Sequence, residues 1–227
     1  MGRGVAAAMI ATLALACGGT APAGPAAPTE SYQAQVHRLD CEAAALQMVL
    51  AGRGIHRSQD ALLQAFGRDP RPPEINPDGS VSAWGDPYAA FVGDPDGSES
   101  DLTGYGVYYP PVAAAARAAG GRIAEAGEAV TPDQLYAALA GGKAAVVWVS
   151  FSPATQYAPQ PLQRYKAFDG RDVPFGQGFE HAVALAGVRA DAVYVFNPEP
   201  GMQPEWLPKS TFEPAYANFG QMAVVLA

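Results

Sequence analysis

The stretch QVHRLDCEAAALQMVLAGRG, from Gln35 to Gly54, decides how this chain is interpreted, because it places a cysteine at the start of a helix. Apolar residues recur at helical spacing from Cys41 to Ala51, and Gly52 follows them. Asp40 stands where an N-cap residue belongs. The first helical turn therefore carries Cys41, and we expect the positive end of the helix dipole to lower its thiol pKa.

A reactive thiol in this position also needs a cationic partner, since the charges of Asp40 and Glu42 disfavour a thiolate. Of the three histidines, His37 lies in the approach loop and His56 in a short polar turn, so we expect both to be solvated. The third histidine, His181, opens the apolar run HAVALAGV and is the candidate.

His181 begins a predicted central strand that ends at Val188, and a second strand, DAVYVFNPEPG, follows after a turn at Asp191. A hairpin of these strands places Asn197, 16 residues on, beside His181. The plainer alternative is a structural histidine whose hydrogen bonds are satisfied at a strand end.

Length and charge limit the class of protein. The 227 residues fit one domain that can bury a core without disulfides. A net charge of -8 is opposite in sign to the Lys/Arg clusters that a nucleic-acid footprint needs, so we expect no nucleic-acid partner.

The N-terminus is typical of an exported protein. Residues 1–16 place Arg3 before a short apolar run, which predicts a signal peptide. Ala16 precedes Cys17 as in a lipobox, so we predict lipidation of Cys17, a disordered tether over residues 17–30 and a folded domain over 31–227. The expected location is the extracytoplasmic side of the cell membrane, with contact only through this anchor; secretion and an uncleaved anchor are the alternatives.

A lipidated Cys17 would leave Cys41 without a partner in the chain. A free thiol in an oxidising compartment needs a reason to be there. A Cys17–Cys41 disulfide and an inert buried thiol are the structural alternatives to a catalytic cysteine.

The middle of the chain is predicted to be scaffold and cleft wall. We expect one helix from Pro132 to Ala140, N-capped by Thr131, a buried strand over 144–151, and another helix over 112–119. The segment from Gly93 to Asp101 is interpreted as an acidic surface loop, with calcium binding as the alternative. Loop aromatics either line a substrate groove or pack the 67–111 insertion onto the core; they are Trp84, Tyr88, Tyr105, Tyr108 and Tyr109.

The segments LDCEAAALQMVL, EHAVALAGV and VFNPEPG resemble the peptidase C39-like family, and the loops WGDPYAAFVGD and GYGVYYPPV resemble parts of its stand-alone bacterial members. The order of Cys, His and Asn is that of papain-like cysteine peptidases. The resemblance covers roughly Tyr32 to the C-terminus. It implies an α+β, papain-like fold with the cysteine on an N-terminal helical part and the His and Asn on an antiparallel sheet.

The same resemblance assigns roles. Cys41 would be the nucleophile, His181 the base and Asn197 the residue that orients the imidazole. Gln35, six residues before Cys41, matches the position of the oxyanion-hole amide, with Gln33 as a less suitable rival. The expected function is hydrolysis of a peptide or amide bond in a peptide or protein substrate, without a cofactor.

One departure from the family pattern affects activity, because Glu42 stands directly after the cysteine where the family often has Gly. The alternatives are a catalytically inactive surface protein that binds peptide or cell-wall material and another papain-fold acyl-transfer enzyme, such as a transglutaminase-like protein or an amidase.

Overall fold

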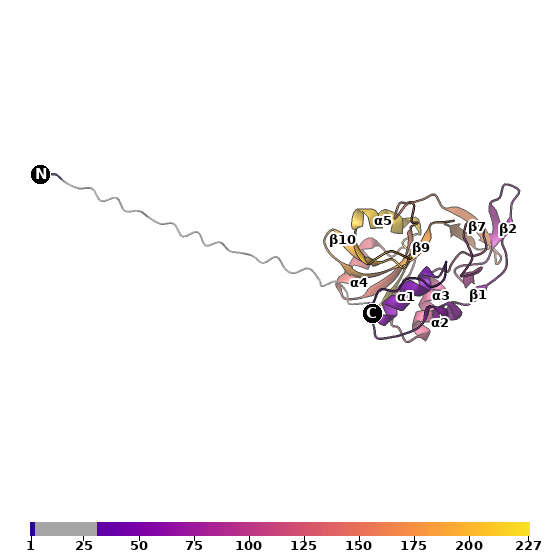
Figure 1. Cartoon of the computed structure of the whole chain (residues 1–227), viewed down its shortest axis with the longest axis horizontal. Coiled ribbons are helices and arrows are strands. Elements are labelled where there is room, and N and C mark those ends of the chain that lie inside the picture. Colours follow the sequence, from indigo (N-terminus) through magenta and orange to yellow (C-terminus); the bar gives the residue numbers. More distant parts are fainter. Residues whose placement is uncertain (3–30) are drawn as a thin grey trace.

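The computed structural model describes residues 1–2 and 31–227 (Figure 1). The predicted signal peptide beyond its first two residues, the lipidation of Cys17 and the tether lie outside the described residues, so they stay predictions. Within residues 1–2 and 31–227, no helix combines the length and the apolar character that crossing a membrane requires.

A six-stranded sheet organises the fold, and every neighbouring pair of its strands is antiparallel. In spatial order its strands are β11 (Glu205–Pro208), β10 (Ala192–Phe196), β9 (Glu180–Val188), β6 (Ala144–Ser150), β12 (Ala223–Leu226) and β5 (Ile123–Gly127). The predicted hairpin of the His181 and Asn197 strands is confirmed as β9 and β10.

Helices cover both faces of this sheet. On one side α1 packs against β9 and β6 together with its helical neighbours (Figure 1); these helices are α1 (Cys41–Ala51), α2 (Gln59–Phe66) and α3 (Tyr109–Ala118). The opposite face is covered by α4 (Pro132–Ala140) and α5 (Lys209–Asn218). Helices packed on an antiparallel sheet confirm the predicted α+β class.

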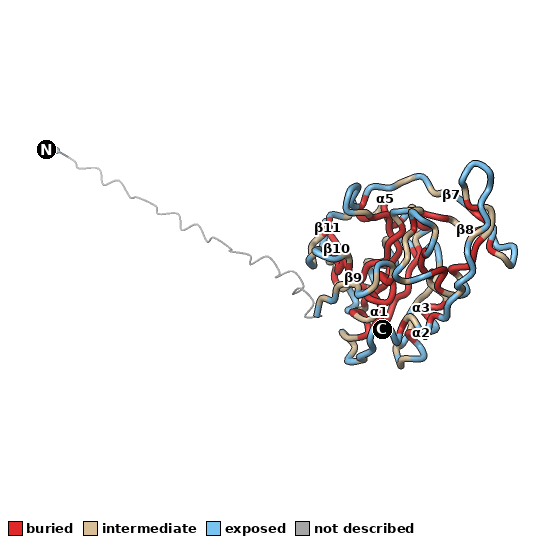
Figure 2. The backbone as a smooth tube through the Cα atoms, turned by 45° about the vertical axis from the view of Figure 1, so that its right-hand side comes forward, coloured by how far each residue is buried: buried red, intermediate tan, exposed pale blue. Residues whose placement is uncertain are grey.

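Two hydrophobic cores lie on the two faces, and the two-residue period of the strands separates them. In β6, Val146 and Trp148 belong to the core beneath α1, whereas Val147 and Val149 belong to the core beneath α4 and α5. The burial map in Figure 2 shows the central strands and α1 as the most buried backbone. Burial on both faces explains why β6 and β9 are continuous apolar runs in the sequence.

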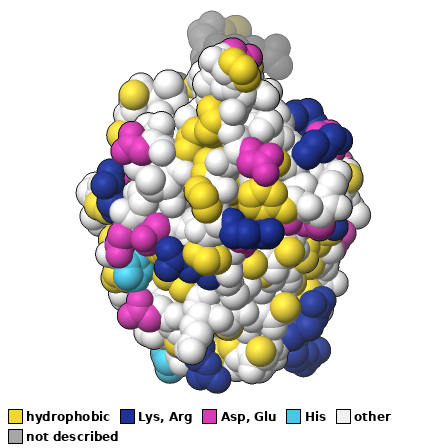
Figure 3. Space-filling model, turned by 90° about the vertical axis from the view of Figure 1, so that its right-hand side faces the viewer, with side chains coloured by type: hydrophobic (Ala, Val, Ile, Leu, Met, Phe, Trp, Pro, Cys, Tyr) yellow, Lys and Arg dark blue, Asp and Glu magenta, His cyan; other side chains and the backbone are white. Residues whose placement is uncertain are grey.

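The insertion between α2 and α3 builds a smaller part of the molecule. It contributes β1 (Arg68–Asp69), β2 (Glu74–Ile75), β3 (Val81–Trp84) and β4 (Phe91–Val92), and β3 pairs in parallel with β7 (Gln163–Ala167), which pairs with β8 (Asp172–Phe175). Trp84, Tyr105 and Tyr108 are fully buried there, which favours the packing interpretation of the loop aromatics. The surface at this end of the molecule carries interspersed acidic, basic and apolar side chains (Figure 3).

The predicted helices are present with small shifts. α3 begins at Tyr109, three residues before the predicted start, because proline in the first turn is compatible with a helix. α4 begins at Pro132 with Thr131 as its N-cap, as predicted. The structure adds a capping box, in which the Thr131 side chain accepts from the Gln134 N–H and the Gln134 side chain accepts from the Thr131 N–H.

Candidate active site

Cys41 is the first residue of α1 and lies against β9, because α1 packs across that strand. Its side chain is 5% exposed, it forms no disulfide within residues 1–2 and 31–227, and Sγ accepts a hydrogen bond from the Ala182 N–H at 3.3 Å. Asp40 occupies the N-cap position without a side-chain cap bond. Its carboxylate instead accepts from the His37 N–H at 3.1 Å, so it shapes the loop that leads into the helix.

A chain of hydrogen bonds holds the His181 ring. Nε2 of His181 lies 2.8 Å from Oδ1 of Asn197, and that oxygen also accepts from the Glu199 N–H at 3.0 Å. The Asn197 amide nitrogen donates to Tyr157 Oη at 2.9 Å. Because a backbone N–H can only donate, Oδ1 is the acceptor, and the neutral imidazole carries its proton on Nε2. Nδ1 of His181 therefore has a free lone pair.

Both side chains open onto one cavity of about 190 Å³. The thiol and the imidazole share this cavity, yet no hydrogen bond joins them within the described part of the chain. Phe151 covers the imidazole, with ring centroids 5.0 Å apart. The polar lining residues besides the pair include Gln35, Glu99, Glu180 and Glu199.

The protonation of the pair differs from the expectation. Burial, followed by the nearby carboxyls of Glu42 and Glu180, raises the pKa of the Cys41 thiol well above its usual value. Burial lowers the pKa of His181 to about 4, against the opposing effect of its bond to Asn197. The prediction of a lowered thiol pKa is wrong, because burial and the neighbouring carboxyls raise the pKa more than the hydrogen bond from the Ala182 N–H lowers it. The resting pair is a neutral thiol and a neutral imidazole.

Three buried carboxyl groups surround the sulfur. Val107 N–H donates to Oε1 of Glu42 at 2.6 Å, and Gly178 N–H donates to Glu99. Burial raises the pKa of Glu42 to about 8, with a smaller contribution from the Asp40 carboxyl. Burial also raises the pKa values of Glu99 and Glu180 well above their usual range, and repulsion from Glu42 adds to both. All three groups bind protons more tightly than ordinary carboxyls do.

Sequence reasoning missed Glu99 and Glu180. Glu99 sits in the segment interpreted as an acidic surface loop, but its side chain is turned inward and 8% exposed. Glu180 directly precedes His181, and the strand period places it on the same face as Ala182, toward Cys41. A carboxyl at the start of an otherwise apolar strand was the available signal.

Gln35 lines the cavity, as its predicted role requires, but both of its amide hydrogens are engaged. Nε2 donates to the carbonyls of His37 at 3.1 Å and Arg38 at 2.8 Å, while Oε1 is buried without a partner among the described residues. The Gln35 backbone N–H donates to Pro198 O at 2.9 Å, which ties this loop to the turn after Asn197. An oxyanion role would require Gln35 to release one of the two carbonyls.

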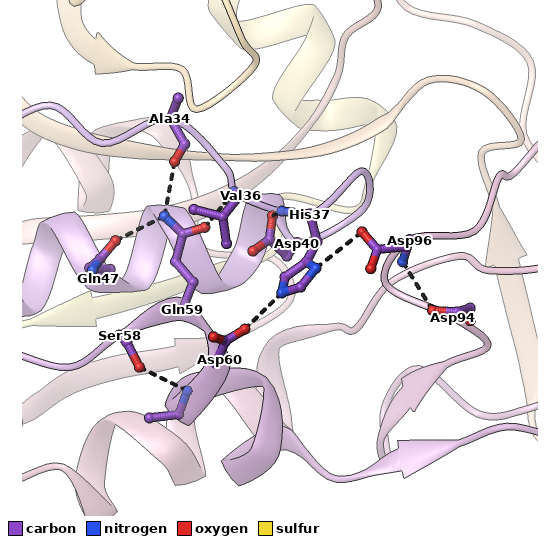
Figure 4. A network of polar contacts seen from close by, with 11 residues as sticks. Ala34, Val36, His37, Asp40, Gln47, Ser58, Gln59, Asp60, Asp94 and Asp96 are labelled. Atoms are coloured by element: carbon purple, nitrogen blue, oxygen red, sulfur yellow. Dashed lines mark hydrogen bonds and ion pairs between the residues drawn. The ribbon is translucent and has the colours of Figure 1, made fainter.

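The two other histidines lie outside the cavity lining. His37 bridges two carboxylates, with Nε2 at 2.7 Å from Asp60 and Nδ1 at 3.1 Å from Asp96 (Figure 4). His37 is thus part of an ion-pair bridge rather than simply solvated. His56 is exposed, as expected.

Comparison with known proteins adds family membership to this geometry. The model of the Peptidase_C39 like family matches residues 30–224. A crystal structure of a Bacillus anthracis protein assigned by name to the C39-like peptidases superimposes with a TM-score of 0.71 at 23% identity, covering 88% of this chain and 95% of that chain. A search of the curated proteins found no match. At this identity the superposition supports the fold alone.

Proposed function

Because the chain belongs to the Peptidase_C39 like family and has its papain-like fold, we propose that it is a cysteine peptidase that hydrolyses a peptide or amide bond through Cys41, His181 and Asn197. The observation that carries the proposal is the 2.8 Å contact between His181 Nε2 and Asn197 Oδ1, from which the tautomer follows. Asn197 holds the proton on Nε2, which leaves the Nδ1 lone pair for a thiol in the same cavity.

In the proposed reaction, Nδ1 of His181 removes the thiol proton as Sγ of Cys41 attacks the substrate carbonyl carbon. The C–S bond forms while the carbonyl π electrons move to oxygen. The tetrahedral intermediate then expels the amine, which takes the proton from the imidazolium. Water, deprotonated by His181, cleaves the thioester and releases the acid and the thiol. A neutral resting pair suits this order, because proton transfer accompanies attack rather than preceding it.

The negative oxygen of the intermediate needs donors. The Cys41 N–H is in the first turn of α1, where backbone N–H groups have no intrahelical acceptor. We assign the second donor to Gln35 Nε2, which would exchange its bond to a loop carbonyl for one to the oxyanion. Gln33 is a weaker candidate, because the described cavity lining includes Gln35 and not Gln33.

The test is alkylation of Cys41 by iodoacetamide, followed by mass spectrometry of the modified peptide, together with product analysis on peptide substrates. We expect His181→Ala to slow alkylation of Cys41 and abolish peptide cleavage. His56→Ala, which removes an exposed histidine, is the matched control. Equal alkylation in the wild type and His181→Ala, without any cleavage product, would contradict the peptidase proposal.

One observation favours a second candidate, a catalytically silent protein that binds peptide or cell-wall material in the same cavity. Burial and two neighbouring carboxyls raise the pKa of the Cys41 thiol, which opposes thiolate formation. Saturable peptide binding that is unchanged in Cys41→Ser, without cleavage by the wild type, would support this candidate. Transfer of the acyl group to an added amine instead of water would identify the acyl-transfer alternative.

We also propose that the protein acts outside the cytoplasm on a lipid anchor at Cys17. The support is the sequence alone, with Arg3 before a short apolar run and Ala16 before the cysteine. In a bacterial host, labelled fatty acid should be incorporated into the wild type and not into Cys17→Ser. Incorporation that is equal in the two proteins would overturn the assignment.

A further inference from the structure

A second possible use of the nucleophile arises from the carboxyls beside it. Sγ of Cys41 and one carboxylate oxygen each from Glu42 and Glu180 lie within 4.8 Å of one another, and all three residues are buried. One side-chain oxygen of each of these two glutamates, Oε2 of Glu42 and Oε1 of Glu180, has no hydrogen-bond partner in the part of the chain that the structure describes. A buried polar atom without a partner is costly, so these oxygens need either shared protons or a cation.

Hydrogen bonds from backbone N–H groups orient two of the three proposed ligands, Glu42 and Cys41. Val107 N–H fixes Oε1 of Glu42 at 2.6 Å, and Ala182 N–H fixes Sγ of Cys41 at 3.3 Å. Gly106 lets the backbone approach the carboxyls, since a Cβ there would lie 2.5 Å from Glu42 Oε1 and 3.2 Å from Glu180 Oε2. Such outer contacts orient metal ligands and raise affinity.

We propose that Cys41, Glu42 and Glu180 form a binding site for a zinc ion that reversibly blocks the nucleophile. A thiolate with two carboxylates selects a borderline-soft ion, because calcium and magnesium take oxygen ligands. Zinc bonds of about 2.0–2.3 Å place tetrahedral ligand atoms roughly 3.5 Å apart. The three ligand atoms lie within 4.8 Å of one another, so side-chain movements of about an ångström would bring them to zinc-binding distances.

Binding would release the thiol proton and the protons held by the two carboxyls to solvent, so the site with one Zn²⁺ would keep one negative charge and would bind the ion more tightly at higher pH. Cys41 and Glu180 also line the cavity, which gives the ion an entry path and leaves its fourth position open to water. The metal site does not depend on hydrolysis; only its effect as an inhibitor rests on the proposed function.

Cobalt(II) serves as the spectroscopic probe for zinc. The full chain would carry Cys17→Ser, so that Cys41 is the only thiol of the two cysteines in the sequence. We expect one equivalent of Co²⁺ to produce a thiolate-to-cobalt charge-transfer band that Zn²⁺ abolishes. Cys41→Ser should remove the band, and Glu180→Gln should weaken Co²⁺ binding at least roughly tenfold. Glu42→Gln should act as Glu180→Gln does.

Glu99→Gln is the matched control, because Glu99 is a buried carboxyl of the same cavity that lies outside the ligand group. Its Co²⁺ affinity should equal that of the parent. The proposal would be overturned by the absence of the band, or by a band that Glu180→Gln leaves unchanged. If circular dichroism shows that Glu42→Gln does not fold, Glu180→Gln and Cys41→Ser alone decide whether the zinc site exists.

A second measurement separates this proposal from the peptidase proposal. Zn²⁺ should slow iodoacetamide alkylation of Cys41 in the parent and in Glu99→Gln, but not in Glu180→Gln. This result does not require a substrate, so it holds or fails whether or not the protein cleaves peptides. Alkylation that Zn²⁺ leaves unchanged in the parent would contradict the blocking role.

Discussion

At the scale of single residues, the Asn197 side chain forms hydrogen bonds with three partners, of which the sequence predicted only His181. Its carbonyl oxygen accepts from both His181 and the Glu199 N–H, and its amide donates to Tyr157, so the amide orientation is fixed from three sides. A neutral Asn does not stabilise an imidazolium as a carboxylate would. Its contribution is therefore to set the tautomer and the orientation of the His181 ring.

Asn197→Ala should lower the kcat for peptide cleavage by roughly 100-fold with little change in KM, because a misplaced base affects the chemical step rather than binding. Tyr157→Phe removes only the hydroxyl behind Asn197 and should cause a smaller loss of kcat. Steady-state kinetics checks both variants. A rise in KM at constant kcat would contradict a positioning role for Asn197.

Gly106 is the second residue with a specific requirement, since a side chain there would collide with Glu42 and approach Glu180. Gly106→Ala should lower the free energy of unfolding by about 1–3 kcal/mol, as overpacking of a buried site does. Urea denaturation gives this value. Gly127→Ala is the control because a Cβ there meets nothing within 4 Å, and an equal loss in both variants would rule out the collision.

At the scale of elements, helix starts divide into two kinds. Ser58 and Thr131 cap α2 and α4 with their side chains, each accepting from a backbone N–H three residues on. Asp40 has the residue type of a cap, but its carboxylate turns back to the His37 N–H. Local sequence predicted the boundaries at Asp40 and Thr131, whereas the use of the Asp40 side chain depends on the loop packed beside it.

Thr131→Ala should lower the free energy of unfolding by about 1 kcal/mol, because it removes the capping bond to Gln134. Denaturant titration is the measurement. Thr131→Ser keeps the hydroxyl and should retain most of the stability. If the serine variant loses as much as the alanine variant, the capping bond is not the cause.

At the scale of the whole molecule, His37 connects the loop before α1 with α2 and with the loop that carries Glu99. Its bonds to Asp60 and Asp96 raise the pKa of His37, the bond to Asp60 having the larger effect and burial opposing it (Figure 4). The Asp40 carboxylate adds to the rise. A protonated His37 therefore stabilises the contact among three separate segments.

The stability from His37 should depend on pH. Because the folded pKa is raised, this contribution is fully present below the unfolded value of 6.5 and is lost as pH rises through the folded pKa. His37→Ala should cost up to about 1 kcal/mol near pH 5.5 and less near pH 8.5, since the bridge is partly exposed. Urea denaturation at both pH values checks this, with His56→Ala as the control. An equal cost at both pH values would exclude the ionic bridge.

The sequence by itself determined the helices α1, α3 and α4, the strand β6 and the β9–β10 hairpin, in this order along the chain. Helical spacing after Asp40, the apolar run after His181 and the turn at Asp191 are local patterns, so they predict α1 and the β9–β10 hairpin without tertiary information. A hairpin sets which residues are neighbours across its two strands, so the predicted hairpin also placed Asn197 beside His181. The hydrogen bond between their side chains confirms this.

Only the tertiary structure decided the environment of the sulfur. The packing of α1 on β9 buries Cys41 and its neighbour Glu42 together with Glu99 and Glu180, which come from distant parts of the chain. Desolvation depends on everything that excludes water from an atom, and no local pattern records it. The stretch from Gln35 to Gly54 therefore fixes where the thiol lies, while the fold around it sets the pKa of that thiol.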